Sequence, residues 1–181
     1  DKDIIFQSDD GSGGVETYFF LDGSFGSSPY TIFPDSSTLA LGTGGDLRLY
    51  HDSSHSYIKS NGTGNIYIMQ QNNDADISFW CDDGSGGDAE YFRLDGGLGW
   101  TVASKNIQFS DSIKASFGSS VDMIIQHNGT NSYIENATGN LEIINGQDDG
   151  DIIFKSDDGS GGIETYFFLD GSANGANPAT V

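Results

Sequence analysis

The sequence has little of what would cross-link the chain, stiffen its loops or carry it through a membrane. It contains one cysteine, Cys81, and 3 prolines in 181 residues. A single cysteine cannot form a disulfide within the chain, which excludes a small secreted fold held together by disulfide bridges. No stretch is apolar and long enough to resemble a signal peptide or a membrane-spanning helix, so membrane insertion is not expected.

Positive charge is also scarce. The chain has 7 Lys and Arg residues against 27 Asp and Glu residues, which gives a net charge of −20. A nucleic acid or an anionic membrane is therefore not an expected partner, because phosphate binding needs clustered cations. The acidic surface is explained by solubility, and it is also compatible with cation binding or salty surroundings.

Turn-forming residues are abundant. The chain has 26 glycines, and 12% of its residues are aromatic. No amphipathic run of helical length is present, and apolar residues instead alternate with polar ones over short stretches. The sequence therefore predicts an all-β fold of short strands joined by tight turns.

Two modules recur with a period of about 75 residues. The first module, which contains the motif SDDGSGG or CDDGSGG, spans 1–24 and returns at 74–97 and 149–172. The second module spans 46–68 and returns at 122–143. The predicted organisation is two full repeats and one truncated repeat, at residues 1–73, 74–148 and 149–181.

The third repeat stops where a strand is expected to begin. Thr180–Val181 correspond to Thr31–Ile32 in the first repeat and to Thr101–Val102 in the second. We therefore expect the chain to be a fragment of a longer repetitive protein.

Each repeat is expected to form about six strands. Apolar residues alternate along several of them, and the run Tyr18–Leu21 is apolar on both faces. A strand that is apolar on both faces must pack between two layers or against a second chain. The predicted fold is an elongated repetitive β structure, with a trimeric β-helix or β-prism fibre favoured and a single-chain β-solenoid as the alternative. The expected alternating pairs are Leu47 and Leu49, Met123 and Ile125 (with Ile124 and Gln126 outward), Ile66 and Ile68, and Leu141 and Ile143.

A recurring pattern of short motifs runs through Leu39–Ile68 and returns in the second module. Its residues are Leu41-Gly42, Asp46-Leu47, Tyr50–Asp52, Ser56–Ile58 and Thr63–Asn65, and in the second copy Asp122, His127, Ser132–Ile134 and Thr138–Asn140. This pattern resembles repeats of tail-fibre and other virion-surface proteins of marine bacteriophages, of the cyanophage and pelagiphage kind, and the resemblance covers about a third of the chain. It implies a β-rich, homotrimeric fibre segment at the virion surface that presents a host-recognition tip. The second copy departs from the pattern at Gln126 and Asn128, where Tyr and Asp are usual.

Pairs of aspartates in the SDDGSGG motif are the first candidates for chemistry. Neighbouring residues on a strand point to opposite faces, so one pair does not provide two carboxylates facing a sugar, and no catalytic residue is assigned. A hairpin loop with Asp-Gly at its turn is the favoured interpretation. Calcium as a cofactor is the alternative, since the motif offers several oxygen ligands. Its candidate ligands are Asp9, Asp10, Asp82, Asp83, Asp157 and Asp158.

Other polar and aromatic residues have both structural and functional interpretations. His51 and His127 share a repeat position, where the ring is expected to bond to the adjacent turn and strand, with a metal on a trimer axis as the alternative. Cys81 replaces serine and is interpreted as a small packed residue. Exposed aromatics would suit a glycan, and buried packing explains them equally well; these are Trp80, Trp100, Tyr30 and Tyr57.

Two functional hypotheses follow. The first is a non-enzymatic structural and attachment fibre segment that self-associates and contacts a host glycan or receptor. The second is an extracellular adhesin or cell-surface fibril subunit of a bacterium or archaeon. In that case the sequons at Asn61, Asn128 and Asn136 would carry glycans.

Overall fold

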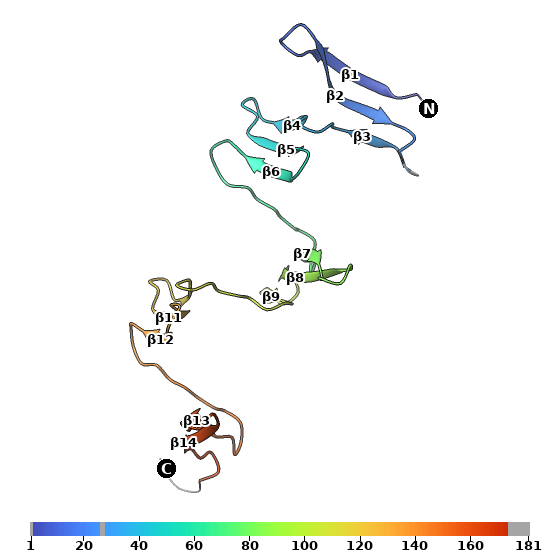
Figure 1. The fold of residues 1–181 in the computed structure, drawn as a ribbon. Coiled ribbons are helices and arrows are strands. Elements are labelled where there is room, and N and C mark those ends of the chain that lie inside the picture. Colours follow the sequence, from blue (N-terminus) through green and yellow to red (C-terminus); the bar gives the residue numbers. More distant parts are fainter. Residues whose placement is uncertain (1, 26–27, 174–181) are drawn as a thin grey trace. The chain divides into compact units, whose positions relative to one another are not determined.

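The computed structural model describes residues 2–25 and 28–173, and the chain is all-β there (Figure 1). The described strands form five small antiparallel sheets. Hydrogen bonding between strands stays within each sheet. The described residues contain no helix that could span a membrane. The chain divides into two units, residues 1–104 and 105–181, and each is considered by itself.

The first module forms a hairpin that is extended in two copies by a third strand; we call these the first-module sheets. In each, the SDDGSGG or CDDGSGG motif connects the two long strands. The unit 1–104 contains two of these sheets, and the unit 105–181 contains the hairpin β13–β14. The strands are β1 (Ile4–Asp9), β2 (Val15–Asp22) and β3 (Tyr30–Ile32); β7 (Ile77–Asp82), β8 (Asp88–Asp95) and β9 (Trp100–Ala103); β13 (Ile152–Asp157) and β14 (Ile163–Leu169).

The second module forms three-stranded antiparallel sheets, which we call the second-module sheets. One lies in each unit. Their strands are β4 (Thr38–Leu41), β5 (Leu47–His51) and β6 (Ser56–Ser60); β10 (Lys114–Phe117), β11 (Met123–His127) and β12 (Ser132–Asn136). The described parts of the two full repeats thus have six strands each, as the sequence predicts.

A pair of phenylalanines and a β-bulge recur in every first-module sheet. Phe6 lies opposite Phe19, and the register shifts at the next position, which leaves Tyr18 without a cross-strand partner. The other two sheets repeat this register. The paired rings are stacked, with centroids 4.3 Å apart in the first sheet and 4.4 Å apart in the other two. The bulge lies within the second strand, three residues after the strand begins.

The chain by itself has almost no hydrophobic core. Among the described residues only Ile124 is buried. Large apolar side chains are exposed throughout the described residues, among them Ile58 (68%), Trp80 (63%) and Trp100 (67%).

Two sequence-based expectations differ from the structure, and one lies outside it. Ile66 and Ile68, like Leu141 and Ile143, lie in segments without a strand, because no neighbouring segment pairs with them. Ile124, expected to point outward, is the most buried described residue, while Ile125 is 45% exposed. Residues Thr180–Val181 lie outside the described residues.

Candidate functional site

The SDDGSGG loop is a closed hairpin turn in which the aspartates bond to the loop itself. Gly11 and Gly13 adopt positive φ angles of 77° and 89°, which favour glycine. The Asp10 carboxylate accepts hydrogen bonds from the backbone N–H groups of Ser12 (2.7 Å) and Gly14 (3.0 Å). The other two copies repeat these bonds through Asp83 and Asp158.

These bonds fix the ionisation of the carboxylate. The N–H groups of Ser12 and then Gly14 hold the pKa of Asp10 below its ordinary value, because they stabilise the charged form. The same N–H donors in the third copy lower the pKa of Asp158. The loop aspartate is therefore ionised at neutral pH and is unsuited to act as a general acid.

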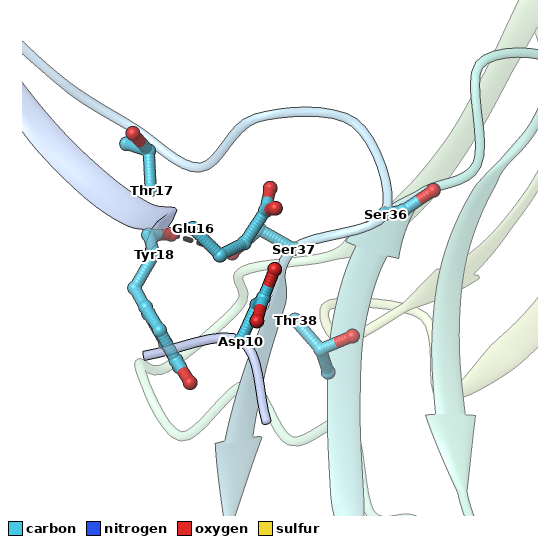
Figure 2. Close-up of a pocket in the computed structure, with 7 residues that line it drawn as sticks. All are labelled: Asp10, Glu16, Thr17, Tyr18, Ser36, Ser37 and Thr38. Carbon is cyan, nitrogen blue, oxygen red and sulfur yellow. Dashed lines mark hydrogen bonds between the residues drawn. The ribbon is translucent and has the colours of Figure 1, made fainter. Parts of the chain in front are cut away.

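A cleft of about 620 Å³ adjoins the first copy of this loop (Figure 2). It lies between the start of β2 and the start of β4, and the Ser37 hydroxyl donates a hydrogen bond to the Tyr18 carbonyl there. In the second repeat Ala89 stands at the position of Glu16, so the second carboxylate of the cleft is not repeated. The cleft is lined by Asp10, Glu16, Thr17, Tyr18, Ser36, Ser37 and Thr38.

The predicted calcium ligands do not gather into a larger cluster. No group of three or more His, Cys, Asp or Glu side chains suited to a metal is found among residues 2–25 and 28–173. The Oδ1 atoms of Asp9 and Asp82 also accept loop N–H groups, from Gly11 and Gly84. The hairpin interpretation is confirmed, and calcium binding stays a prediction.

The two equivalent histidines have the same structural partner. His51 Nδ1 lies 3.0 Å from the Ser56 hydroxyl, and His127 Nδ1 lies 3.0 Å from the Ser132 hydroxyl. Each serine begins the strand that pairs with the histidine's own strand. The expected bond to the following Ser-Tyr-Ile strand is therefore present in both copies.

The three sequons lie at turns. Asn61 is exposed in the turn after β6. The Asn128 side chain accepts two loop N–H bonds and donates one to the Tyr133 hydroxyl. The amide of Asn136 donates to the carbonyls of Thr138 and Gly139. Asn61 and Asn128 are exposed and Asn136 is half-buried, and the side chains of Asn128 and Asn136 are engaged in their turns.

One apolar face is the same in all three first-module sheets, and we call it the phenylalanine face. Cross-strand pairing places the stacked phenylalanines on it beside a second pair, one isoleucine and one leucine. The four residue types are identical in each copy. In the middle sheet Phe79 is 40% and Phe92 is 41% exposed. The three sets are Ile4, Phe6, Phe19 and Leu21; Ile77, Phe79, Phe92 and Leu94; Ile152, Phe154, Phe167 and Leu169.

The opposite face, which we call the second face, changes between copies. The first and third sheets pair isoleucine with phenylalanine there, as Ile5 with Phe20 and Ile153 with Phe168. The middle sheet pairs Ser78 with Arg93. The second face of the middle sheet therefore combines charged residues with Trp80, Trp100 and Val102, whereas the outer two sheets pair two apolar residues at this position.

Arg93 is the centre of an ion cluster on that second face. Its guanidinium contacts Glu90 at 2.8 Å, Asp95 at 3.0 Å and Asp76 at 3.4 Å. The Ser104 hydroxyl also donates to Glu90, at 2.7 Å. Hydrogen bonds from the Ser104 hydroxyl and, to a smaller extent, from Arg93 lower the pKa of Glu90. Hydrogen bonds to Glu90 and, to a smaller extent, to Asp95 raise the pKa of Arg93.

The sequence interpretation did not single out this Arg93 cluster. The signal was present, because Arg93 and Glu90 replace Phe20 and Thr17 of the first repeat in an otherwise similar module. Cys81, expected to be packed, is exposed because its side of the sheet has no covering layer. Trp80 and Trp100, paired with Glu90 and Asp95, are also exposed.

Comparison of the chain with protein-family models, with curated proteins and with solved structures finds no match.

Proposed function

We propose that this chain is a non-enzymatic structural segment of an attachment fibre, built from identical chains that associate along their length. The observation that carries the proposal is the phenylalanine face, which is repeated in three sheets and left exposed by the single chain. The chain buries its apolar residues only when another surface covers them. Repetition of that face over the chain suits an extended contact better than a single binding patch.

The exposed apolar side chains support an obligate association, because obligate interfaces resemble a hydrophobic core divided between chains. The unpaired segments that contain Ile66 and Ile68, and Leu141 and Ile143, add further alternating apolar residues to this surface. A homotrimeric β-prism or β-helix is the arrangement we favour, since it covers both apolar faces of a sheet with copies of the same chain.

The bacteriophage tail fibre is the setting we propose, on the resemblance of Leu39–Ile68 to marine phage repeats. There the segment would act as a spacer at the virion surface and hold a host-recognition tip away from the particle. The loops contribute turns to this spacer, because their aspartates are committed to loop N–H groups. The exposed Trp80 and Trp100 are the residues we propose for contact with a host glycan.

Sedimentation equilibrium of the purified chain tests the proposal. The expected mass is a small multiple of 19.3 kDa, three for the favoured homotrimer, and it should persist on dilution to low concentration. A monomer at all concentrations, with the exposed apolar surface intact, would overturn the fibre proposal.

A second candidate is an extracellular adhesin or fibril subunit, and the exposed position of Asn61 favours it. Intact-mass measurement of the protein from its native source separates the two. Hexose-sized additions that disappear in Asn61→Gln support the adhesin, and an unmodified mass supports the phage fibre.

A further inference from the structure

Both tryptophans of the chain lie on the second face of the middle sheet. Trp80, on β7, pairs with Glu90 on β8. Trp100, on β9, pairs with Asp95 on β8. Both carboxylates contact the guanidinium of Arg93, at 2.8 and 3.0 Å. Each half of the face thus combines one tryptophan with one carboxylate of the Arg93 cluster.

Both rings are exposed to solvent, and the fold does not require the one on β7. Trp80 is 63% and Trp100 is 67% exposed. The other two copies have the polar residues Gln7 and Lys155 at the position of Trp80. The middle copy therefore has a large aromatic ring where the same module elsewhere has a side chain suited to water. Exposed aromatic residues beside fixed polar groups are typical of a binding surface.

The polar groups between the rings are held in place and remain accessible. Glu90 Oε1 accepts hydrogen bonds from Arg93 and from the Ser104 hydroxyl. Asp95 Oδ2 accepts a hydrogen bond from Arg93, and Asp95 Oδ1 accepts one from the backbone N–H of Leu98. The side chains of Arg93 and Glu90 are 27% and 17% exposed, so a ligand on this face can reach them. Groups that are already ordered lose little entropy when a ligand binds, and charged groups form the stronger hydrogen bonds.

The chemistry of the face selects a neutral ligand rich in hydroxyl groups. An apolar surface laid on the cluster would remove water from the carboxylates without replacing their hydrogen bonds. An anionic ligand would be repelled, because three carboxylates surround one guanidinium and leave two negative charges. A cationic ligand would meet the guanidinium of Arg93 between the two rings. A sugar hydroxyl both donates and accepts hydrogen bonds, so it suits the carboxylates and the guanidinium together.

The spacing of the two rings gives the size of the ligand. About four residue steps along the strands and two strand spacings separate Trp80 from Trp100, which places their Cα atoms about 16 Å apart. Arg93 lies on the strand between them. An extended oligosaccharide can reach both tryptophans, whereas a single sugar ring can reach only one.

We propose that the second face of the middle sheet binds a neutral oligosaccharide, with the apolar side of one sugar ring on each tryptophan and hydroxyl groups bonded to the Arg93 cluster between them. The inference rests on the attachment function proposed above and specifies the class of glycan that the chain would contact. All of the residues involved belong to one sheet of the unit 1–104.

The tryptophans themselves provide the measurement. The chain has no other tryptophan, so its tryptophan fluorescence comes from this face alone. Quenching by acrylamide is measured on the full chain with neutral oligosaccharides of glucose, mannose and galactose. An oligosaccharide of galacturonic acid is the anionic counterpart of the galactose probe, and oligolysine is the cationic probe. We expect saturable protection from quenching by a neutral oligosaccharide and no protection by either charged probe. The free sugars should bind about 100-fold more weakly, because each occupies one ring at a time.

A substitution taken from the first copy tests the role of the ring. Trp80→Gln gives the middle sheet the residue that stands at Gln7 in the first copy. It should weaken binding about tenfold or more, with Trp100 as the remaining reporter. Trp80→Tyr keeps an aromatic ring and should retain most of the binding. The matched control is Tyr67→Gln, since Tyr67 is 75% exposed but lies between β6 and β7, outside the sheet, and it should bind as the native chain does.

Each result decides a different point. Absence of protection by every neutral oligosaccharide, or equal binding by Trp80→Gln and the native chain, would overturn the glycan site. The fibre function would still stand if the chain sediments as a small multiple of 19.3 kDa. Equal protection by either charged probe would overturn the assignment of a neutral sugar. Tryptophans that are shielded without sugar and become quenchable on dilution would show that another copy covers this face, which would also overturn the site. A chain that binds the oligosaccharide as a monomer would overturn the fibre function and support the glycan site.

Discussion

Replacing Phe79 and Phe92 together by serine is expected to dissociate the assembly. The two side chains are 40% and 41% exposed in the single chain. A phenylalanine side chain has about 200 Å² of surface, so association would bury about 80 Å² more of each. At about 25 cal/mol for each Å², the loss is about 2 kcal/mol for each ring and about 4 kcal/mol for each chain. Four kcal/mol corresponds to roughly a 10³-fold weakening for each chain.

Sedimentation velocity over a dilution series measures this change directly. The matched control is Leu98→Ser, since Leu98 is 56% exposed but lies in the turn before β9, away from the phenylalanine face. The double variant F79L/F92L restores apolar area without the ring stack and should stay assembled. If F79S/F92S remained assembled at the same dilution as the native chain and the Leu98 control, the phenylalanine face would not be the contact between chains.

Three further outcomes are expected. Gly84→Ala should destabilise the protein by about 1–2 kcal/mol in urea unfolding, because Gly84 has a φ of 80° and an L residue is strained there. The control Ser85→Ala, in the same loop, should be nearly neutral. Equal destabilisation by both substitutions would contradict the turn geometry. An NMR titration of the Glu90 carboxyl carbon should give a pKa below the ordinary value of 4.5, and Ser104→Ala should raise that pKa. The contribution of ionised Glu90 to folding stability is present above the ordinary pKa and is lost as the pH falls through the lowered pKa. The melting temperature should be the same in calcium and in chelator, because the loop carboxylates already accept hydrogen bonds from N–H groups. A rise of the melting temperature in calcium that Asp83→Asn abolishes would instead establish the calcium site.

Local features of the fold were predictable because they depend on neighbouring residues. The hairpin loop follows from Asp10-Gly11, since an aspartate and a positive-φ glycine satisfy the turn by themselves. The bond of His51 to Ser56 follows from antiparallel pairing of two strands joined by a short turn. The same predictions apply to the other copies because the same residues stand at the equivalent positions.

Features that depend on a covering layer were not predictable in the same way. Alternation at Ile66 and Ile68 indicated a strand, but a strand needs a neighbour to pair with, and the described residues provide none. Ile124 and Ile125 are adjacent apolar residues on one strand, so alternation alone did not decide which of them the chain buries. Two carboxylates of the Arg93 cluster, Glu90 and Asp95, lie on β8 itself, and only the contact with Asp76 depends on the pairing of β7 with β8.

The pattern of change among the repeats separates two kinds of constraint. The SDDGSGG loop recurs because its backbone needs glycine at positive φ angles and an aspartate that accepts the loop N–H groups. Both requirements lie within the loop and do not depend on its surroundings. The phenylalanine face has no comparable local requirement, since its side chains are largely exposed and the strands pair through their backbones. A set of four largely exposed apolar residues is the same in three sheets, while the opposite face differs in the middle one, and a constraint from outside the single chain explains this best. We propose that this constraint is the contact with another copy of the chain, made through the phenylalanine face of each first-module sheet.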